Sequence, residues 1–293
     1  MRRRLFVLVL AAVAIAAVFA PRSDEKKVER PAIEVRRVAS ASYVEPAKRR
    51  TIFVLIIGSD VREGDPKRGR SDSLHILALD TKKGTGTLIG IPRDSYVPIP
   101  GHGTSKINAS LYFGGPELTV RTVEQLTGIG FDYWALIDFS RFRKLVDVLG
   151  GVEVNVPYPM NDHFSGANFK AGRTKMNGAE ALAFSRNRHD ARGGDFGRSE
   201  NQGRLLIAAL EKFRKDAKSP LKLAKYLRAF DDLVVSDVGI GELLQLAAVG
   251  RRVEPGKVKN LVVPGRAGSA GGASVVFISP GDLFEKVRDD ARL

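Results

Sequence analysis

The chain has 293 residues, of which 43% are hydrophobic, a composition typical of one large globular domain or two small ones. Its 47 Lys and Arg residues exceed its 33 Asp and Glu residues by 14, which favours a polyanionic partner such as nucleic acid, anionic lipid headgroups or a phosphate-bearing polymer. The absence of cysteine excludes disulfides, thiolate metal sites, a cysteine nucleophile and a lipidated N-terminal cysteine.

The N-terminus predicts export to the membrane. Three arginines at positions 2–4 precede an apolar run over residues 5–20, which ends at Pro21. This order is typical of a secretory signal, and the run is also close to the length of a membrane span. We therefore expect residues 1–20 to be a signal peptide or a retained signal-anchor in the cell membrane, with the rest of the chain extracytoplasmic. That location argues against nucleic acid as the partner.

Residues 21–50 mix charges, prolines and small residues without a helical or strand period, which predicts an extracytoplasmic linker. Order is expected to begin at Thr51. Three buried strands are predicted over residues 52–57, 74–79 and 85–91, because these runs are rich in β-branched and other apolar residues.

Charged residues cluster at the ends of these three strands. They are Asp60, Arg70, Asp72, Arg93 and Asp94. If neighbouring strands are antiparallel, the start of the second strand lies beside the ends of the first and third. We therefore expect the five side chains to converge on one edge of a sheet.

The remainder alternates helical and strand patterns. Helices are predicted over residues 116–128, 139–149, 177–184, 221–230 and 241–249, from Ser199 onward, and from Pro280 onward. Strands are predicted over residues 133–137, 152–156, 258–263 and 274–278. Two segments are predicted as loops: a long polar surface loop over residues 157–176, and a mobile Gly/Ala/Ser loop over residues 265–274.

An arginine-rich stretch over residues 185–198 predicts a phosphate or pyrophosphate site. It holds four arginines, and the arginine fork matches phosphate oxygens in pairs. Gly193 and Gly194 would let the chain turn so that both halves face one anion. A solvated basic loop is the alternative interpretation. The lone His189 does not indicate a metal site, and the chain lacks the Walker, Rossmann and nucleophile-elbow motifs.

Taken in order, several short motifs resemble the LytR-CpsA-Psr family. The motifs are Gly58-Ser59-Asp60, Arg70-Ser71-Asp72, Ile91-Pro92-Arg93-Asp94, Lys106-Ile107-Asn108, Gly114-Gly115, Leu149-Gly150-Gly151-Val152, Arg186-x-Arg188 and Asp195-x-Gly197-Arg198, with Gln202 shortly after. The resemblance covers Thr51 to Lys215, and its specificity comes from many spaced motifs recurring in one order.

The resemblance implies a fold and an activity. The fold would be an α/β three-layer sandwich, in which a central mixed β-sheet carries helices on both faces, preceded by an N-terminal membrane segment. The phosphotransferase domain would span residues 51–218, with residues 219–293 as a C-terminal extension packed on it. The enzyme would move a glycopolymer from a polyprenyl-pyrophosphate carrier to a hydroxyl of peptidoglycan, at the cytoplasmic membrane, and form a phosphodiester.

The resemblance also implies roles for individual residues. Asp60 and Asp72 would hold Mg²⁺ or Mn²⁺. The pyrophosphate would be bound by Arg70, Arg93, Arg186, Arg188, Arg198 and Gln202. The catalytic set would be Arg93, Asp94, Arg188, Asp195 and Arg198. Removal of the acceptor proton stays open among Asp60, Asp72 and Asp94.

Two departures from the family pattern, Asn201 where many relatives carry arginine and Gly90 where serine is common, concern the fit of the substrate. The predicted loop 157–176 is the expected place for polymer specificity. Two other functions remain as alternatives. The first is a pyrophosphatase of polyprenyl-pyrophosphate-linked substrates, with water as the acceptor. The second is a non-catalytic binder of anionic envelope polymers.

Overall fold

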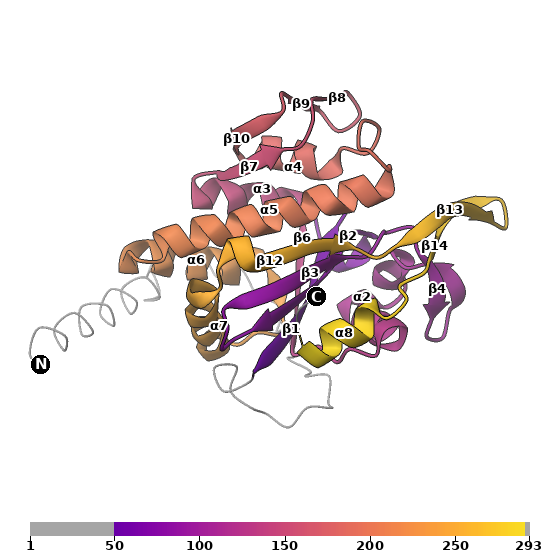
Figure 1. Cartoon of the computed structure of the whole chain (residues 1–293), viewed down its shortest axis with the longest axis horizontal. Coiled ribbons are helices and arrows are strands. Elements are labelled where there is room, and N and C mark those ends of the chain that lie inside the picture. The colour runs from indigo at the N-terminus through magenta and orange to yellow at the C-terminus, as the bar shows by residue number, and fades with distance from the viewer. Residues whose placement is uncertain (1–49, 291–293) are drawn as a thin grey trace, which may run out of the picture.

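The computed structural model describes residues 50–290 (Figure 1). The predicted signal segment 1–20 and all of the predicted linker except Arg50 lie outside this range. Within residues 50–290, none of the helices combines the length and the apolar character needed to cross a membrane.

A six-stranded mixed sheet forms the centre of the fold, in the order β11-β6-β1-β2-β3-β12. The three predicted N-terminal strands are adjacent and antiparallel, while β6 and β12 pair in parallel with β1 and β3. Their bounds are β1 (Thr51–Ser59), β2 (Ser71–Asp80), β3 (Thr85–Gly90), β6 (Tyr133–Asp138), β11 (Val235–Ser236) and β12 (Val258–Val262). The predicted α/β fold around a central mixed sheet is thereby confirmed.

Side chains that alternate along the strands build a core on each face of the sheet. On one face, Leu55 and Ile57 of β1 pack with α2 (Ala109–Thr127) and α8 (Leu283–Asp290). On the other face, Ile52 packs with α5 (Asp195–Asp216) and α7 (Ile240–Arg252). Helix α2 begins earlier than predicted and kinks at Gly114 and Gly115, where the backbone leaves helical angles.

A second core lies on the far side of α5, at the top of Figure 1. It is formed by α3 (Phe139–Leu149), α4 (Gly178–Arg186), β7 (Val152–Val156), β8 (Met160–Asp162), β9 (Ala167–Phe169) and β10 (Gly172–Met176). The prediction of a surface loop over residues 157–176 was therefore wrong. The segment forms β8, β9 and β10, and its polar composition concealed an alternation in which Met160, Asp162 and Ala167 are buried.

The C-terminal segment contributes strands to the same sheet. After α6 (Pro220–Leu233), it supplies the edge strands β11 and β12. The prediction of a mobile loop over residues 265–274 was wrong. This segment belongs to the hairpin of β13 (Gly265–Ala270) and β14 (Ala273–Ile278), which projects from the body of the fold (Figure 1). Gly271 and Gly272 make its tight turn with φ of 54° and 78°, a conformation that glycine adopts without strain.

Candidate active site

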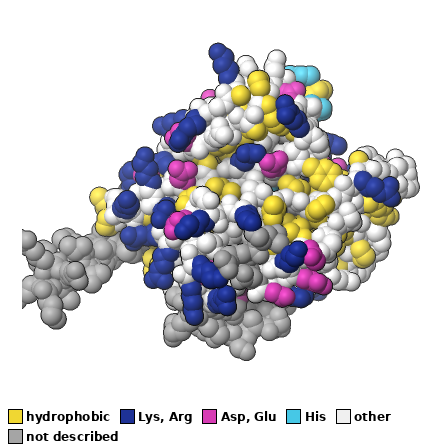
Figure 2. Space-filling view, viewed as in Figure 1, with side chains coloured by type: hydrophobic (Ala, Val, Ile, Leu, Met, Phe, Trp, Pro, Cys, Tyr) yellow, Lys and Arg dark blue, Asp and Glu magenta, His cyan; other side chains and the backbone are white. Residues whose placement is uncertain are grey.

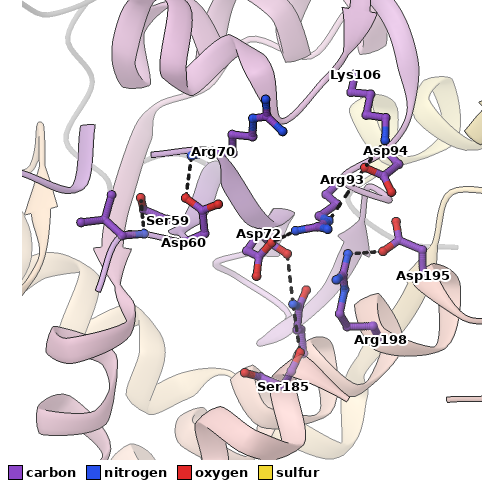
Figure 3. A network of polar contacts seen from close by, with 12 residues as sticks. Ser59, Asp60, Arg70, Asp72, Arg93, Asp94, Lys106, Ser185, Asp195 and Arg198 are labelled. Carbon is purple, nitrogen blue, oxygen red and sulfur yellow. Dashed lines mark hydrogen bonds and ion pairs between the residues drawn. The ribbon is translucent and has the colours of Figure 1, made fainter. Parts of the chain in front are cut away.

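Charged residues from the ends of β1, β2 and β3 gather at one edge of the central sheet (Figure 3). Asp60 follows β1, Asp72 is the second residue of β2, and Arg93 and Asp94 follow β3. The predicted convergence at the strand ends is confirmed for Asp60, Asp72, Arg93 and Asp94, but the Arg70 side chain takes no part in it. Arg70 joins it through its backbone, whose N–H donates to Asp60 Oδ1 at 2.8 Å, while its exposed guanidinium extends away from Asp60.

Gly69 allows the loop between β1 and β2 to close on Asp60. A Cβ atom at this position would lie 2.4 Å from Ser59 Oγ, 2.6 Å from Val61 Cγ2 and 2.7 Å from Asp60 Oδ1. The backbone N–H of Asp60 also donates to the carbonyl of Arg70 at 3.0 Å. Together these contacts fix the Asp60 carboxylate at the sheet edge.

Arg93 is the centre of an ion-pair network. Its guanidinium pairs with Asp72 Oδ1 and lies 3.8 Å from Asp94 Oδ1. Burial alone would lower the pKa of Arg93, but Asp72 and Asp94 outweigh that effect and raise it. Arg93 Nε is buried without a hydrogen-bond partner within residues 50–290, and the nearby Asp94 carboxylate interacts with it through charge alone.

Lys106 is a member of the site to which sequence reasoning gave no role. Its Nζ lies 3.3 Å from Asp94 Oδ1. Lys106 ends β5 (Gly103–Lys106), which pairs with β4 (Tyr96–Ile99) in a register that places it opposite Tyr96, two residues after Asp94. The hairpin pairing of residues 96–106 was the signal that would have found it.

The site has two walls: the strand-end residues around Arg93 form one, and the first turn of α5 forms the wall opposite. The predicted start of this helix at Ser199 was wrong, because α5 begins at Asp195, directly after Gly193 and Gly194 with φ of 83° and 60°. Asp195 and Arg198 consequently face the same side, one turn apart, and form an ion pair. Figure 3 shows the Arg93 and Arg198 guanidinium groups entering one space from opposite sides.

Arg198 is almost fully buried, at 5% exposure. Burial is the largest influence on it and lowers its pKa, and repulsion from Arg93 and Arg188 lowers it further, against the attraction of Asp195. Asp195 Oδ2 is buried without a hydrogen-bond partner in the described chain. The guanidinium groups of Arg93, Arg188 and Arg198 therefore repel one another, and a bound polyanion would relieve this repulsion.

Gln202 joins the two walls. Its amide Nε2 donates to the carbonyls of Asp72 and Ser185, each at 3.2 Å, and so connects α5 with β2 and α4. Arg188 is half-buried and acts on Arg198 through charge. Arg186 is placed differently: its guanidinium lies over the Phe139 ring, 5.1 Å from the centroid.

The two predicted metal ligands offer a partial site. Asp60 Oδ1 accepts the Arg70 N–H and Asp72 Oδ1 pairs with Arg93, so Oδ2 of each carboxylate has no protein partner in residues 50–290. Within that range, three or more His, Asp or Glu side chains do not gather into a complete metal cage. Two carboxylates nevertheless fit Mg²⁺, which is commonly bound by one or two carboxylates together with substrate phosphates.

A buried histidine below the site was missed from the sequence. His75 of β2 is fully buried, its Nδ1 lies 3.1 Å from Ser73 Oγ, and its Nε2 lies 3.1 Å from the carbonyl of Ser199 in α5. Gly90 makes room for this contact, since a Cβ there would lie 2.2 Å from Ser199 Oγ. The sequence feature that could have revealed it is the alternation along β2, which places His75 on the same strand face as Leu77 and Leu79, the face that packs toward α5.

Burial lowers the pKa of His75 from 6.5 to about 4. Between these values the unfolded chain binds more protons than the folded chain, so stability is lost as the pH falls through this window. We expect His75 to contribute about 3 kcal/mol of this loss between about pH 6.5 and pH 4. Urea unfolding of His75→Gln should show a weaker pH dependence than the parent chain. The exposed His102→Gln is the matched control, and an unchanged dependence in His75→Gln contradicts this assignment.

Comparisons with known proteins agree on one family. The LytR_cpsA_psr family model matches residues 14–292. The polyisoprenyl-teichoic acid–peptidoglycan teichoic acid transferases TagU and TagV of Bacillus subtilis (strain 168) are 39% identical over 166 residues and 31% identical over 250 residues. These alignments cover 56% and 82% of this chain, but 53% and 64% of the relatives, so the chain spans between half and two thirds of their lengths.

Two further comparisons extend this agreement. The crystal structure of B. subtilis TagV matches with a TM-score of 0.71 and 30% identity, over 83% of this chain and 96% of that structure. The regulatory protein MsrR of Staphylococcus aureus (strain COL) is 35% identical over 219 residues, which is 73% of this chain and 64% of MsrR.

Proposed function

The chain belongs to the LytR-CpsA-Psr family, and we propose that it is a phosphotransferase that moves a glycopolymer from a polyprenyl-pyrophosphate carrier to a hydroxyl of peptidoglycan. The observation that carries the proposal is the pair of guanidinium groups, Arg93 and Arg198, that enter one space from opposite walls beside Asp72 and Asp195. The names of TagU and TagV, teichoic acid transferases acting between a polyisoprenyl carrier and peptidoglycan, support the substrate class.

Phosphoryl transfer needs positioning and neutralisation of negative charge more than covalent help from the protein. The acceptor hydroxyl oxygen attacks the phosphorus on the polymer side and its proton passes to one of the carboxylates Asp60, Asp72 and Asp94. The bond from that phosphorus to the bridging oxygen breaks, and polyprenyl phosphate leaves. Arg93 and Arg198 neutralise the charge that develops on the phosphate oxygens. Asp195 holds Arg198 in place, and Lys106 holds Asp94 beside Arg93.

Asp60 and Asp72 are the residues that would hold Mg²⁺ or Mn²⁺. The ion supplies additional neutralisation of the phosphate oxygens when it is bound. Gln202 holds α5 against β2 and α4 through its hydrogen bonds to the carbonyls of Asp72 and Ser185.

We place the enzyme at the outer face of the cytoplasmic membrane. The arginines at positions 2–4 before the apolar run 5–20 support an N-terminal segment oriented with its start in the cytoplasm. The net charge of +14 suits an environment of anionic envelope polymers.

The test is product analysis with the full chain in detergent micelles. A polyprenyl-pyrophosphate-linked oligosaccharide and a peptidoglycan glycan oligomer are expected to give a phosphodiester-linked product and polyprenyl phosphate. Free oligosaccharide phosphate as the only product would identify a pyrophosphatase. Binding of the donor without turnover would identify a non-catalytic binder.

A further inference from the structure

The β13–β14 hairpin, which projects from the body of the fold, is attached to the segment that carries Asp94 (Figure 1). The backbone N–H of Val276 in β14 donates to the carbonyl of Asp94 at 2.8 Å, and Val276 forms a parallel β-bridge with Ser95. The Phe277 ring meets the Tyr96 ring of β4 edge-on, with 6.1 Å between the ring centroids. These contacts fix the hairpin beside the candidate active site.

The outer edge of β13 presents unpaired backbone groups. Because the turn of the hairpin has two residues, Ala270 and Ala273 on either side of it exchange hydrogen bonds, and the pairing alternates from there. Ala267 and Ser269, which are exposed, consequently direct their N–H and C=O groups away from β14. Within the described part of the chain, β13 pairs with β14 alone. An open edge of this kind can pair with an extended peptide.

The side chains of β13 leave this edge accessible and give it one positive charge. The strand consists of Gly, Ala and Ser apart from Arg266. The exposed Arg266 guanidinium lies over the Phe277 ring, 5.5 Å from the centroid, and pairs with none of the carboxylates in residues 50–290. A guanidinium stacked on a ring keeps its in-plane N–H donors free for an anion. In Figure 2 the projecting hairpin, at the right edge, carries basic and hydrophobic side chains.

We propose that the outer edge of β13 binds an acidic, extended peptide, namely the stem peptide of the peptidoglycan acceptor. The inference rests on the proposed function, because it takes peptidoglycan as the acceptor. The edge supplies backbone hydrogen bonds to the peptide, and Arg266 supplies a charge-assisted bond to one of its carboxylates. The acceptor is favoured over the donor because the hairpin is attached at Asp94, one of the three carboxylates that can take the proton of the acceptor hydroxyl.

The experiment measures the affinity of the full chain, in detergent micelles, for two glycan oligomers. One oligomer carries its acidic stem peptides, and the other has had them removed. The parent chain should bind the peptide-bearing oligomer more tightly. Ala267→Pro removes one outward N–H without removing a hydrogen bond of the hairpin. It should weaken binding of the peptide-bearing oligomer about three- to tenfold and leave binding of the peptide-free oligomer unchanged.

Ser274→Pro is the matched control. Ser274 faces Ser269 across the hairpin, so its N–H also points outward, but from the edge of β14. The same substitution there should leave both affinities unchanged. Equal affinity of the parent chain for the two oligomers, or equal losses in Ala267→Pro and Ser274→Pro, overturns the assignment to the edge of β13. A loss in Ala267→Pro that is the same for both oligomers overturns the peptide as the ligand.

Replacement of Arg266 tests the charge. Arg266→Gln should weaken binding of the peptide-bearing oligomer and make that binding less sensitive to salt, because the attraction between exposed charges is screened by salt. Arg266→Lys should retain most of the affinity, since it keeps the charge. An unchanged salt dependence in Arg266→Gln overturns the contact with a carboxylate.

Transfer kinetics separate the acceptor from the donor. Ala267→Pro should raise KM for the peptide-bearing acceptor and leave KM for the polyprenyl-pyrophosphate donor unchanged. A rise confined to the donor overturns the assignment to the acceptor. Failure of the proposed function has a separate signature, since the oligomer affinities would then follow the expected pattern without any phosphodiester-linked product being formed.

Discussion

Replacement of Arg93 by alanine is expected to lower the rate of polymer transfer by about 10³-fold, near the upper end for loss of one preorganised donor to a transition-state anion. The change removes the charge that neutralises the phosphate oxygens. It also leaves Asp72 and Asp94 without their shared partner, so that two carboxylates repel the incoming pyrophosphate. The measurement is the single-turnover rate of polyprenyl phosphate release.

Two variants sharpen this test. Arg93→Lys keeps the charge but loses the planar fork that reaches both carboxylates, so it should recover only part of the rate. Arg173→Ala removes an arginine that is paired with Glu153 on the exposed face of β10 and should behave like the parent chain. A rate for Arg93→Ala close to that of Arg173→Ala is incompatible with the proposed site.

Asp72→Asn is expected to reduce transfer by about 10²-fold or more. The amide keeps the shape of the side chain but removes the charge that pairs with Arg93 and that would bind the metal ion. Asp60→Asn removes only the proposed metal contact, so its rate should recover at high Mg²⁺ more fully than that of Asp72→Asn. The dependence of the rate on Mg²⁺ concentration, measured for both variants, checks this order.

Asp65→Asn is the control for the same loop. Asp65 is exposed, and its carboxylate accepts the backbone N–H of Lys67 at 3.0 Å, away from the ion-pair network. It should leave both the rate and its Mg²⁺ dependence unchanged. Transfer that continues at the full rate in Asp72→Asn, or in the presence of chelator, contradicts the assigned roles of these carboxylates.

The gathering of Asp60, Asp72 and Arg93 could be predicted because it follows from local patterns. Three adjacent apolar runs predict antiparallel neighbours, and the strand ends then fix which loops meet. Position along the chain is sufficient for that inference. The structure adds that Arg93 pairs with Asp72 and that its Nε lies 3.8 Å from Asp94 Oδ1.

Residues whose partners come from distant elements could not be found in this way. His75 contacts a carbonyl 124 positions away, and Gln202 bonds to a carbonyl 130 positions away. Asp162 is of a residue type common in loops, yet it is buried. Ser165, Phe164 and His189 supply the hydrogen bonds that its carboxylate needs there. A buried polar group of this kind depends on tertiary contacts that periodicity does not encode.

Helix α5 shows a failure of a different kind. Ser199 is a good helix-capping residue type, and the preceding Gly-Gly pair suggested a longer loop. The helix instead begins at Asp195, directly after Gly194, whose positive φ ends the loop abruptly. This earlier start is what places Asp195 and Arg198 on the same helical turn.

The source of the oxygen in the new phosphate bond tests the central proposal most directly. The reaction is run in ¹⁸O-labelled water with a polyprenyl-pyrophosphate-linked oligosaccharide and an unlabelled peptidoglycan glycan acceptor, and the products are analysed by mass spectrometry. Transfer to the acceptor hydroxyl predicts a linked phosphodiester that contains no ¹⁸O. Oligosaccharide phosphate carrying one ¹⁸O, without any linked product, would contradict it.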